Sequence, residues 1–368
     1  MRAFNRRGTV RPGSCYKVAK RRRAAALQDL SEIRVTPVYA RAFWSAPALW
    51  RFFEHLLPHI SIFHLPSSIL YASAVHFRKI TIIGVGLLGG SIGLAVRRRK
   101  LARQIAGFVR RRASLKDCER AGAVDFATTD LPAAVWDADF VILCLPLSQM
   151  RPVVERMLPA LKRGAIVTDV GSVKASVVRE LESLVAKAGA HFVGSHPLAG
   201  AEKTGVSAAR ADLFVNTVCV MTPTKKTNQA ALKKVEQFWR AIGSRGLRLT
   251  PEIHDSLVSR SSHLPHIIAA TLASQVLNPA QPRHQAALCA NGFRDTTRIA
   301  SGSPEMWRDI ALANRRNLAK SLEAFIADLQ KFRRVLKKAD AEAIATFFET
   351  AKKRRDNWCA GCASPSPE

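Results

Sequence analysis

Hydrophobic and polar positions follow two different patterns along this chain. In the first pattern, short runs rich in apolar residues alternate with helix-length stretches, which is typical of strands buried on both faces of a parallel sheet. The apolar runs span residues 79–83, 104–109, 139–146 and 165–169. We therefore expect residues 78–246 to form an α/β domain with a doubly wound, Rossmann-type parallel sheet.

The second pattern begins after residue 246, where apolar residues recur every three or four positions and Arg and Lys occupy the other faces. This spacing occurs in residues 255–277, 304–338 and 340–356. It predicts an all-α C-terminal domain over residues 247–356, followed by a tail over residues 357–368.

The first 77 residues differ from the rest in composition. They contain 12 Lys and Arg but only three Asp and Glu, together with all three tyrosines of the chain. Such an Arg-rich, acid-poor segment fits an organelle transit peptide, a disordered arm, or sequence upstream of the native start. We expect residues 1–77 to be a dispensable extension that carries no chemistry.

Charge and cysteine content narrow the class of protein. The excess of 57 Lys and Arg over 28 Asp and Glu gives a net charge of +29, which suits an anionic substrate or a nucleic acid. No nucleic acid is expected, because a basic stripe with interleaved aromatic residues is missing. Seven dispersed cysteines do not form a secreted disulfide framework, and no apolar run is long enough to span a membrane. We expect a cytoplasmic protein, or a plastid one if residues 1–77 are a transit peptide.

A glycine-rich turn follows the first predicted strand and opens an apolar helix. Gly84, Gly86 and Gly89 have the GxGxxG spacing, which in this context indicates a dinucleotide site. Gly84 would make the tight turn, Gly86 would let the backbone approach the pyrophosphate, and Gly89 would allow close helix–strand packing. Leu87 and Leu88 lie in the first helical turn, where backbone amides face the phosphates.

The end of the second strand bears on the choice between NAD and NADP. An NAD site normally has an acidic residue here that binds the ribose 2′-hydroxyl, but this chain has Val109 followed by Arg110 and Arg111. Guanidinium groups without a carboxylate favour a 2′-phosphate, and hence NADP over NAD. The alternative is that these arginines form only the solvated start of a helix.

Two more turns are expected at the nicotinamide end of the cofactor, because ligands bind beyond the carboxyl ends of parallel strands. One turn runs from Cys144 to Pro146, and the other contains Ser172. Cys144 is expected to act as a small buried apolar residue rather than as a nucleophile.

Five short motifs follow one another within residues 78–355. They are DVGSVK (169–174), FVGSHPLAGAEKTG (192–205), SSHLPH (261–266), GFRDTTRIA (292–300) and MWRD (306–309). Together they resemble the signature of the prephenate/arogenate dehydrogenases of tyrosine biosynthesis. The resemblance implies NAD(P)-dependent oxidative decarboxylation of prephenate to 4-hydroxyphenylpyruvate, with arogenate to tyrosine as the alternative, and a homodimer formed by the helical domain.

Within this resemblance, His196 matches the catalytic histidine of the family. The reaction needs a base for the proton of the C4 hydroxyl group, and a neutral imidazole suits this role near pH 7. Ser172 matches a serine that hydrogen-bonds the histidine and the substrate hydroxyl group, although a serine here could equally serve as a helix N-cap.

The substrate carries two carboxylates, so cationic or hydrogen-bonding partners are required. Arg298 matches the family arginine that binds a carboxylate, for which its planar guanidinium is suited; a surface salt bridge is the alternative. His266 and Ser262 match positions that line the same pocket. Trp307 is expected at the pocket wall or in the core, and Glu202 could gate the pocket by pairing with Arg298.

The chain departs from the family pattern at Ala201, where many members have Thr, and this removes one hydrogen-bond donor. Glu202 alone does not decide between prephenate and arogenate, so prephenate is preferred on frequency alone. Asp255 is expected to order the region through a salt bridge. No metal is expected, because no carboxylate completes a metal-site spacing with His263 and His266.

The predicted tail contains one further motif, the Cys-x-x-Cys pair Cys359 and Cys362. Without a second pair it is a weak metal signal, and no function is expected of it.

Overall fold

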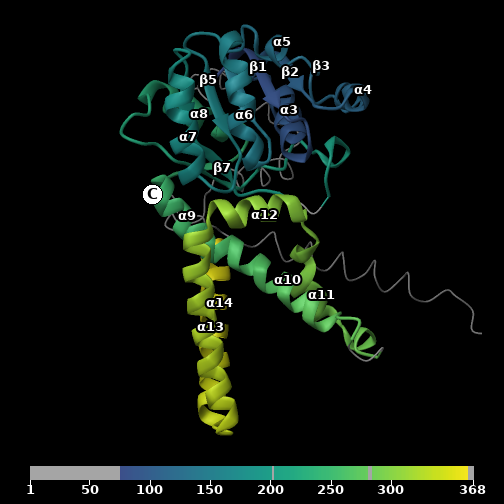
Figure 1. Ribbon diagram of the computed structural model, residues 1–368, viewed down its shortest axis with the longest axis vertical. Helices are drawn as coiled ribbons and strands as arrows, with labels where there is room; N and C mark the ends of the chain where they lie inside the picture. Colours follow the sequence, from purple (N-terminus) through teal and green to yellow (C-terminus); the bar gives the residue numbers. More distant parts are fainter. Residues whose placement is uncertain (1–74, 201–202, 281–283, 364–368) are drawn as a thin grey trace, which may run out of the picture. The chain divides into compact units, whose positions relative to one another are not determined.

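The computed structural model describes residues 75–200, 203–280 and 284–363. Within them, a parallel six-stranded sheet has the strand order β3-β2-β1-β4-β5-β6 (Figure 1). The strands are β1 (Phe77–Ile83), β2 (Ala102–Phe108), β3 (Phe126–Thr128), β4 (Phe140–Leu143), β5 (Ile166–Asp169) and β6 (His191–Val193). The order reverses between β1 and β4, which confirms the predicted doubly wound sheet and places a ligand crevice at their carboxyl ends.

Both faces of the sheet are covered because its central strands are apolar on both sides. In β4, Phe140 and Ile142 join one buried cluster, whereas Val141 and Leu143 join the other. The first cluster includes helices α3 (Leu87–Arg99) and α8 (Gln229–Ala241), and the second includes α5 (Leu131–Val135), α6 (Leu147–Met157) and α7 (Ala175–Ala186). Alternate side chains of a strand point to opposite faces, so continuous apolar runs are required here.

A second, three-stranded sheet was not predicted from the sequence. It consists of β7 (Ser195–Pro197), β8 (Val218–Met221) and β9 (Arg245–Arg248) in the order β7-β8-β9. Strand β7 pairs antiparallel with β8, and His196 lies opposite Val220. Three residues are too few to show a periodic pattern, which is why the histidine motif gave no sign of its strand.

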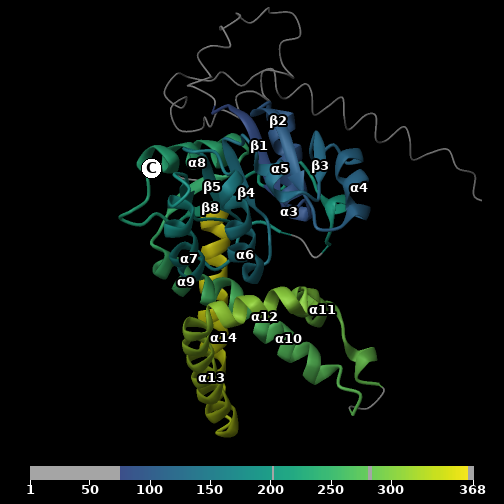
Figure 2. The same ribbon diagram turned by 45° about the horizontal axis from the view of Figure 1, so that its top comes forward.

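The C-terminal part of the described chain is helical, as predicted. Its helices are α9 (Pro251–Val258), α10 (Leu264–Val276), α11 (Asn291–Thr297), α12 (Pro304–Ala313), α13 (Arg315–Lys337) and α14 (Ala341–Ala363). Figures 1 and 2 both show α13 and α14 side by side, where Phe332 contacts Phe347 with 4.5 Å between ring centroids. No helix in the described ranges is long and apolar enough to cross a membrane.

Two of the stretches with helical spacing are not single regular α-helices. Residues 259–263 form a π-helical turn between α9 and α10, just before Pro265, which lacks the N–H group of a regular helix. Asn314 separates α12 from α13 with φ −109° and ψ 24°. Its side-chain Nδ2 donates to the carbonyl of Asp255 at 2.8 Å, so the break holds the two parts of the helical region together.

Some predicted ends also differ from the structure. Phe77 begins β1 and stacks on Phe140, with ring centroids 4.6 Å apart, so it belongs to the sheet rather than to the basic extension. Leu247 lies in β9, and the helices begin only at Pro251. Helix α14 continues to Ala363, past the predicted end at residue 356. Residues 1–74 of the predicted extension and residues 364–368 of the tail lie outside the described residues.

Candidate active site

The glycine-rich turn has the geometry that its spacing predicts. Gly84 has φ +98°, a conformation that other residues rarely adopt, and a Cβ atom there would lie 2.4 Å from the carbonyl oxygen of Cys144. A Cβ atom at Gly89 would lie 2.1 Å from the carbonyl oxygen of Gly84. At Gly86 a Cβ atom would meet nothing within 4 Å. The outer glycines therefore close the turn, and the middle one keeps open the space beside the start of α3.

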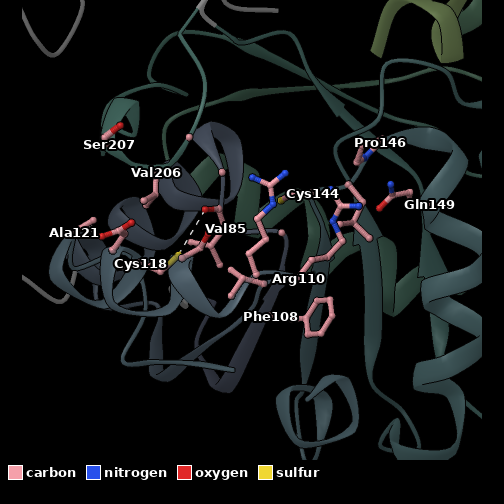
Figure 3. Close-up of a pocket in the computed structure, with 18 of the residues that line it drawn as sticks. Val85, Phe108, Arg110, Cys118, Ala121, Cys144, Pro146, Gln149, Val206 and Ser207 are labelled. Atoms are coloured by element: carbon pink, nitrogen blue, oxygen red, sulfur yellow. Dashed lines mark hydrogen bonds between the residues drawn. The ribbon is translucent and has the colours of Figure 1, made fainter. Parts of the chain in front are cut away.

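A cavity of about 690 Å³ lies beside this turn, at the carboxyl ends of β1, β2 and β4 (Figure 3). Six predicted cofactor-binding residues line it: Gly84, Gly86, Arg110, Arg111, Cys144 and Pro146. Leu87, Leu88, Gly89 and Ser172 do not line it. The leucine side chains pack against the core, so only the amides of this first helical turn, which have no partner within a helix, are suited to a phosphate.

The walls of the cavity carry more positive than negative charge. Arg110 and Arg111 are exposed, and Val109 is buried where a ribose-binding carboxylate would otherwise lie. From α4 (Leu115–Arg120), Asp117 and Arg120 also line the cavity, and they pair with each other at 2.9 Å. The carboxylate of Asp117 is thus already neutralised by a cation.

Cys144 lies in the same wall with a neutral side chain. Burial, and to a lesser degree the charge of Asp169, raises the pKa of its thiol. A thiol that stays protonated is a poor nucleophile, which agrees with the expected apolar role of Cys144.

His196 lies in β7 and is only 8% exposed. Its Nδ1 atom lies 2.9 Å from Nε2 of His254, in the first turns of α9. Burial lowers the pKa of His196 well below its usual value, and the nearby His254, Lys174 and His263 lower it further. The imidazole is therefore neutral near pH 7 and able to accept a proton.

A buried ion pair holds β7 against the end of β5. The ammonium group of Lys174 contacts the carboxylate of Asp169, and both side chains are fully buried. Lys174 Nζ also donates to the carbonyl of Ser195 at 3.0 Å, while the amide of Ser195 donates to Asp169 at 3.0 Å. A buried charge without its partner is costly, so the two charged groups stay paired. Because both also bond the backbone of Ser195, they fix the position of the residue immediately before His196.

Asp255 connects the helical region to the segment between β5 and α7. Its Oδ1 accepts a hydrogen bond from the amide of Lys174 at 2.7 Å, and its Oδ2 accepts one from the amide of Ala175 at 2.9 Å. Asp255 thus caps α7 and also contacts His254 Nδ1 at 2.8 Å. It orders the region as expected, but through amides and an imidazole rather than through a Lys or Arg salt bridge.

Three predicted substrate-binding residues of the helical region, Ser262, His266 and Trp307, form a second group. His266 stacks on Trp307 with ring centroids 3.7 Å apart, and its Nδ1 lies 3.0 Å from the carbonyl of Ser262. Burial lowers the pKa of His266. Arg298 begins a short 3-10 turn and is exposed. Glu202 lies outside the described residues.

His263 lies between the two groups. Its ring contacts Trp307 edge-on at 6.1 Å, and it is close enough to His196 to lower the pKa of that residue. Burial lowers the pKa of His263 itself to about 4. Among the described residues, no hydrogen bond or ring contact joins His196 directly to His266.

Two family models match the chain. Residues 92–247 match the nucleotide-binding domain of prephenate dehydrogenase, and residues 250–350 match its dimerization domain. The chain belongs to the prephenate dehydrogenase family. A dehydrogenase of this family is an oxidoreductase, and the stretch that matches its nucleotide-binding domain contains five of the six strands of the parallel sheet, β2 to β6.

Similarity to individual dehydrogenases and to their crystal structures supports this family assignment. Prephenate dehydrogenase of Bacillus subtilis is 35% identical over 75% of this chain and 75% of its own length. Cyclohexadienyl dehydrogenase of Zymomonas mobilis is 36% identical over 76% of this chain and 95% of its own length. The crystal structure of A. aeolicus prephenate dehydrogenase in complex with hydroxyphenyl propionate and NAD+ covers 77% of this chain and 99% of its own, with 32% identity and a TM-score of 0.72.

An arogenate dehydrogenase is also similar to this member of the prephenate dehydrogenase family. The crystal structure of the Synechocystis enzyme covers 76% of this chain and 99% of its own, with 30% identity and a TM-score of 0.64. Membership of the family therefore leaves the choice between the two substrates open.

Sequence reasoning missed His254 and assigned no role to Asp169 and Lys174. Thr250 and Pro251 are a recognisable helix start, and Thr250 indeed caps α9 by accepting from the amide of Ile253 at 3.2 Å. This signal could have placed His254 near the start of a helix. Its pairing with His196, 58 residues away, has no sequence signal.

No metal site is apparent in the described parts of this dehydrogenase, where no three His, Cys, Asp or Glu side chains are arranged to hold an ion. Cys359 is exposed on α14. The position of the Cys362 side chain lies outside what the structure describes.

Proposed function

We propose that this chain catalyses the NAD(P)-dependent oxidative decarboxylation of prephenate to 4-hydroxyphenylpyruvate, with His196 as the catalytic base. The observation that carries the proposal is a buried, neutral imidazole held in a short strand within the His-Pro motif of this family. The similarity to two prephenate dehydrogenases, at 35% and 32% identity, supports the substrate.

The nucleotide cavity fits a dinucleotide cofactor. The space beside Gly86 is open because no side chain fills it, so a pyrophosphate could approach the backbone amides of Leu87, Leu88 and Gly89. Cys144, Pro146 and Ser172 would lie toward the nicotinamide ring. When bound, the cofactor supplies the acceptor for the hydride that leaves C4 of the substrate.

His196 would accept the proton of the C4 hydroxyl group as the hydride leaves the same carbon atom. The bond from C1 to its carboxylate then breaks, its electron pair enters the ring, and CO₂ departs as the ring becomes aromatic. The proton held by His196 can return to the phenolic oxygen. Ser172 would hold the substrate hydroxyl group in line with the imidazole.

We assign the remaining predicted residues to substrate binding. Prephenate carries two carboxylates, for which the exposed guanidinium of Arg298 is suited as a partner. His266, whose Nδ1 donates to the carbonyl of Ser262, would line the same pocket. Ser262 and Trp307 lie around His266 and would form the pocket wall. Glu202 would gate the pocket by pairing with Arg298.

We propose that the preferred nucleotide is NADP. Arg110 and Arg111 line the cavity at the position where an NAD-specific site has a carboxylate, and guanidinium groups attract a 2′-phosphate that a carboxylate would repel. Replacing both arginines with Ser should raise the KM for NADP about 10-fold or more, at ~1.4 kcal/mol per tenfold change, and leave the KM for NAD nearly unchanged. Steady-state kinetics with each nucleotide measure this. Equal effects on both nucleotides would contradict the assignment of the 2′-phosphate to these arginines.

The proposed activity is tested by following reduced-nicotinamide absorbance with prephenate and, in parallel, with arogenate. Turnover of prephenate is expected. Turnover of arogenate alone would instead assign the second substrate, in keeping with the similarity to an arogenate dehydrogenase. Silence with both substrates and both nucleotides would overturn the proposed function.

A further inference from the structure

The proposed base His196 is the last of three groups in a row, a carboxylate and two imidazoles. Asp255 Oδ1 lies 2.8 Å from His254 Nδ1, and His254 Nε2 lies 2.9 Å from His196 Nδ1. Asp255 is 2% exposed and His254 fully buried, so water does not compete for these bonds. Each bond needs one donor and one acceptor, so the position of the proton on one group determines the position of the proton on the next.

The direction of the row is set by Asp255. Its two oxygen atoms already accept hydrogen bonds from the amides of Lys174 and Ala175, and an ionised carboxylate can only accept. His254 must therefore carry its proton on Nδ1 and donate it to Asp255. In a neutral ring the other nitrogen is then an acceptor.

His196 is forced into one tautomer as a result. Its Nδ1 faces the acceptor Nε2 of His254, so Nδ1 must carry the proton and donate it. Nε2 of His196 is then the unprotonated nitrogen, and it is the nitrogen that faces away from His254. The row sets this tautomer when the His254 ring is neutral; a charged ring would carry protons on both nitrogens and donate to His196 Nδ1 instead.

We propose that His254 and Asp255 are positioning residues that hold His196 in the tautomer with an unprotonated Nε2, the form required of the base. This inference rests on the proposed function of His196. When His196 accepts a proton at Nε2, its Nδ1–H still donates to His254. The acceptor Nε2 of His254, and Asp255 behind it, then lie on the side of the ring that carries the new positive charge. Nothing else in the row changes partners.

Other charged groups near the row do not supply this tautomer. Lys174 is neutralised by Asp169 and points to the carbonyl of Ser195. His263 accepts at Nδ1 from Asn314 Nδ2, at 3.2 Å. Among the described residues, His254 is the only hydrogen-bond partner of the His196 ring.

The test is a matched pair of amide substitutions at one position. In His254→Gln the amide reaches about as far as Nε2 and can accept from His196, but it loses Asp255. In His254→Asn the amide stands near the Nδ1 position and can reach Asp255, but not His196. The same two substitutions at His284, which is exposed, are the controls.

We expect the Asn variant to lose kcat about 10²-fold or more, within the range for misplaced general bases, with a prephenate KM within a few fold of wild type. The Gln variant should keep at least ten times the kcat of the Asn variant. A merely structural role of the contact between His254 and Asp255 predicts the opposite order. That order, or equal activity in both variants, would overturn the proposal.

Nitrogen-15 NMR of histidine-labelled protein reports the tautomer of His196 independently of enzyme activity. The His196 signal, assigned by its loss in His196→Asn, should show a protonated Nδ1 and a bare Nε2 in the wild type, and a mixture or the reverse in His254→Asn. A protonated Nε2 in the wild type would overturn the proposal even if prephenate is turned over. A wild-type protein with the expected tautomer but no turnover would instead count against the proposed function alone.

Discussion

At the scale of single residues, the environment of His196 decides in which protonation state it works. Its pKa is lowered mainly because burial disfavours the charged ring, and the neighbouring His254 and Lys174 add to this effect. A base must be unprotonated before it acts, so a lowered pKa extends activity toward acid. The ring is thus suited to accept a proton at any pH near neutrality.

Replacing His196 with Asn should lower kcat by about 10²–10⁴-fold, with a smaller change in KM, because a general base contributes this much to a rate. In the wild type, kcat/KM should stay level as the pH falls through about 6.5, the ordinary pKa of histidine, and decline only below it. A pH–rate profile with both nucleotides measures this. A decline that begins above pH 6.5 would contradict this prediction, because it would mean that the pKa of the catalytic base is not lowered.

At the scale of elements, one turn performs two tasks through different glycines. Gly89 lets α3 pack against the end of β1, because any side chain would collide with the carbonyl of Gly84. Gly86 has open space around its α-carbon and is needed only when a ligand approaches. Folding and cofactor binding are therefore separable within a single helical turn.

This separation predicts opposite results for two alanine substitutions. Gly89→Ala should destabilise the fold by about 1–3 kcal/mol, as overpacking typically does, and lower Tm. Gly86→Ala should leave Tm nearly unchanged and raise the nucleotide Kd, because the methyl group occupies the space of the pyrophosphate. Thermal unfolding and nucleotide titration of both variants measure this; a Gly86→Ala protein with wild-type nucleotide affinity would place the pyrophosphate elsewhere.

At the scale of the whole molecule, the helical region exposes apolar side chains that a single chain does not cover. Leu329, Leu336 and Phe348 of α13 and α14 are 49%, 56% and 59% exposed, and this region matches the dimerization domain of the family. Exposed apolar side chains of this kind mark interaction surfaces. We therefore propose that the chain is a homodimer and that these helices contribute to its interface.

The double substitution Leu336→Asp and Phe348→Asp should convert the dimer to a species of 40.4 kDa, because charges at a buried interface are costly. Analytical ultracentrifugation measures the mass. Trp136→Asp, at a side chain that is 69% exposed outside the helical region, is the matched control. A dimer that survives the double substitution would place the interface on other helices.

Local patterns were sufficient for much of this molecule. The apolar runs of β1 and β4 indicate burial on both faces, and the spacing of Gly84, Gly86 and Gly89 indicates a nucleotide turn, because both depend on residues close in sequence. The family motifs likewise pointed to His196 and to the class of reaction.

Only the tertiary structure decided how the site is assembled. The contact of His196 with His254, the cap that Asp255 places on α7 and the break at Asn314 each join segments more than 50 residues apart. The sequence by itself determined which elements form and which chemical groups they carry, because periodicity and turn chemistry are local. The partners and protonation states of those groups depend on burial and hydrogen bonds between distant elements, which exist only once the chain has folded.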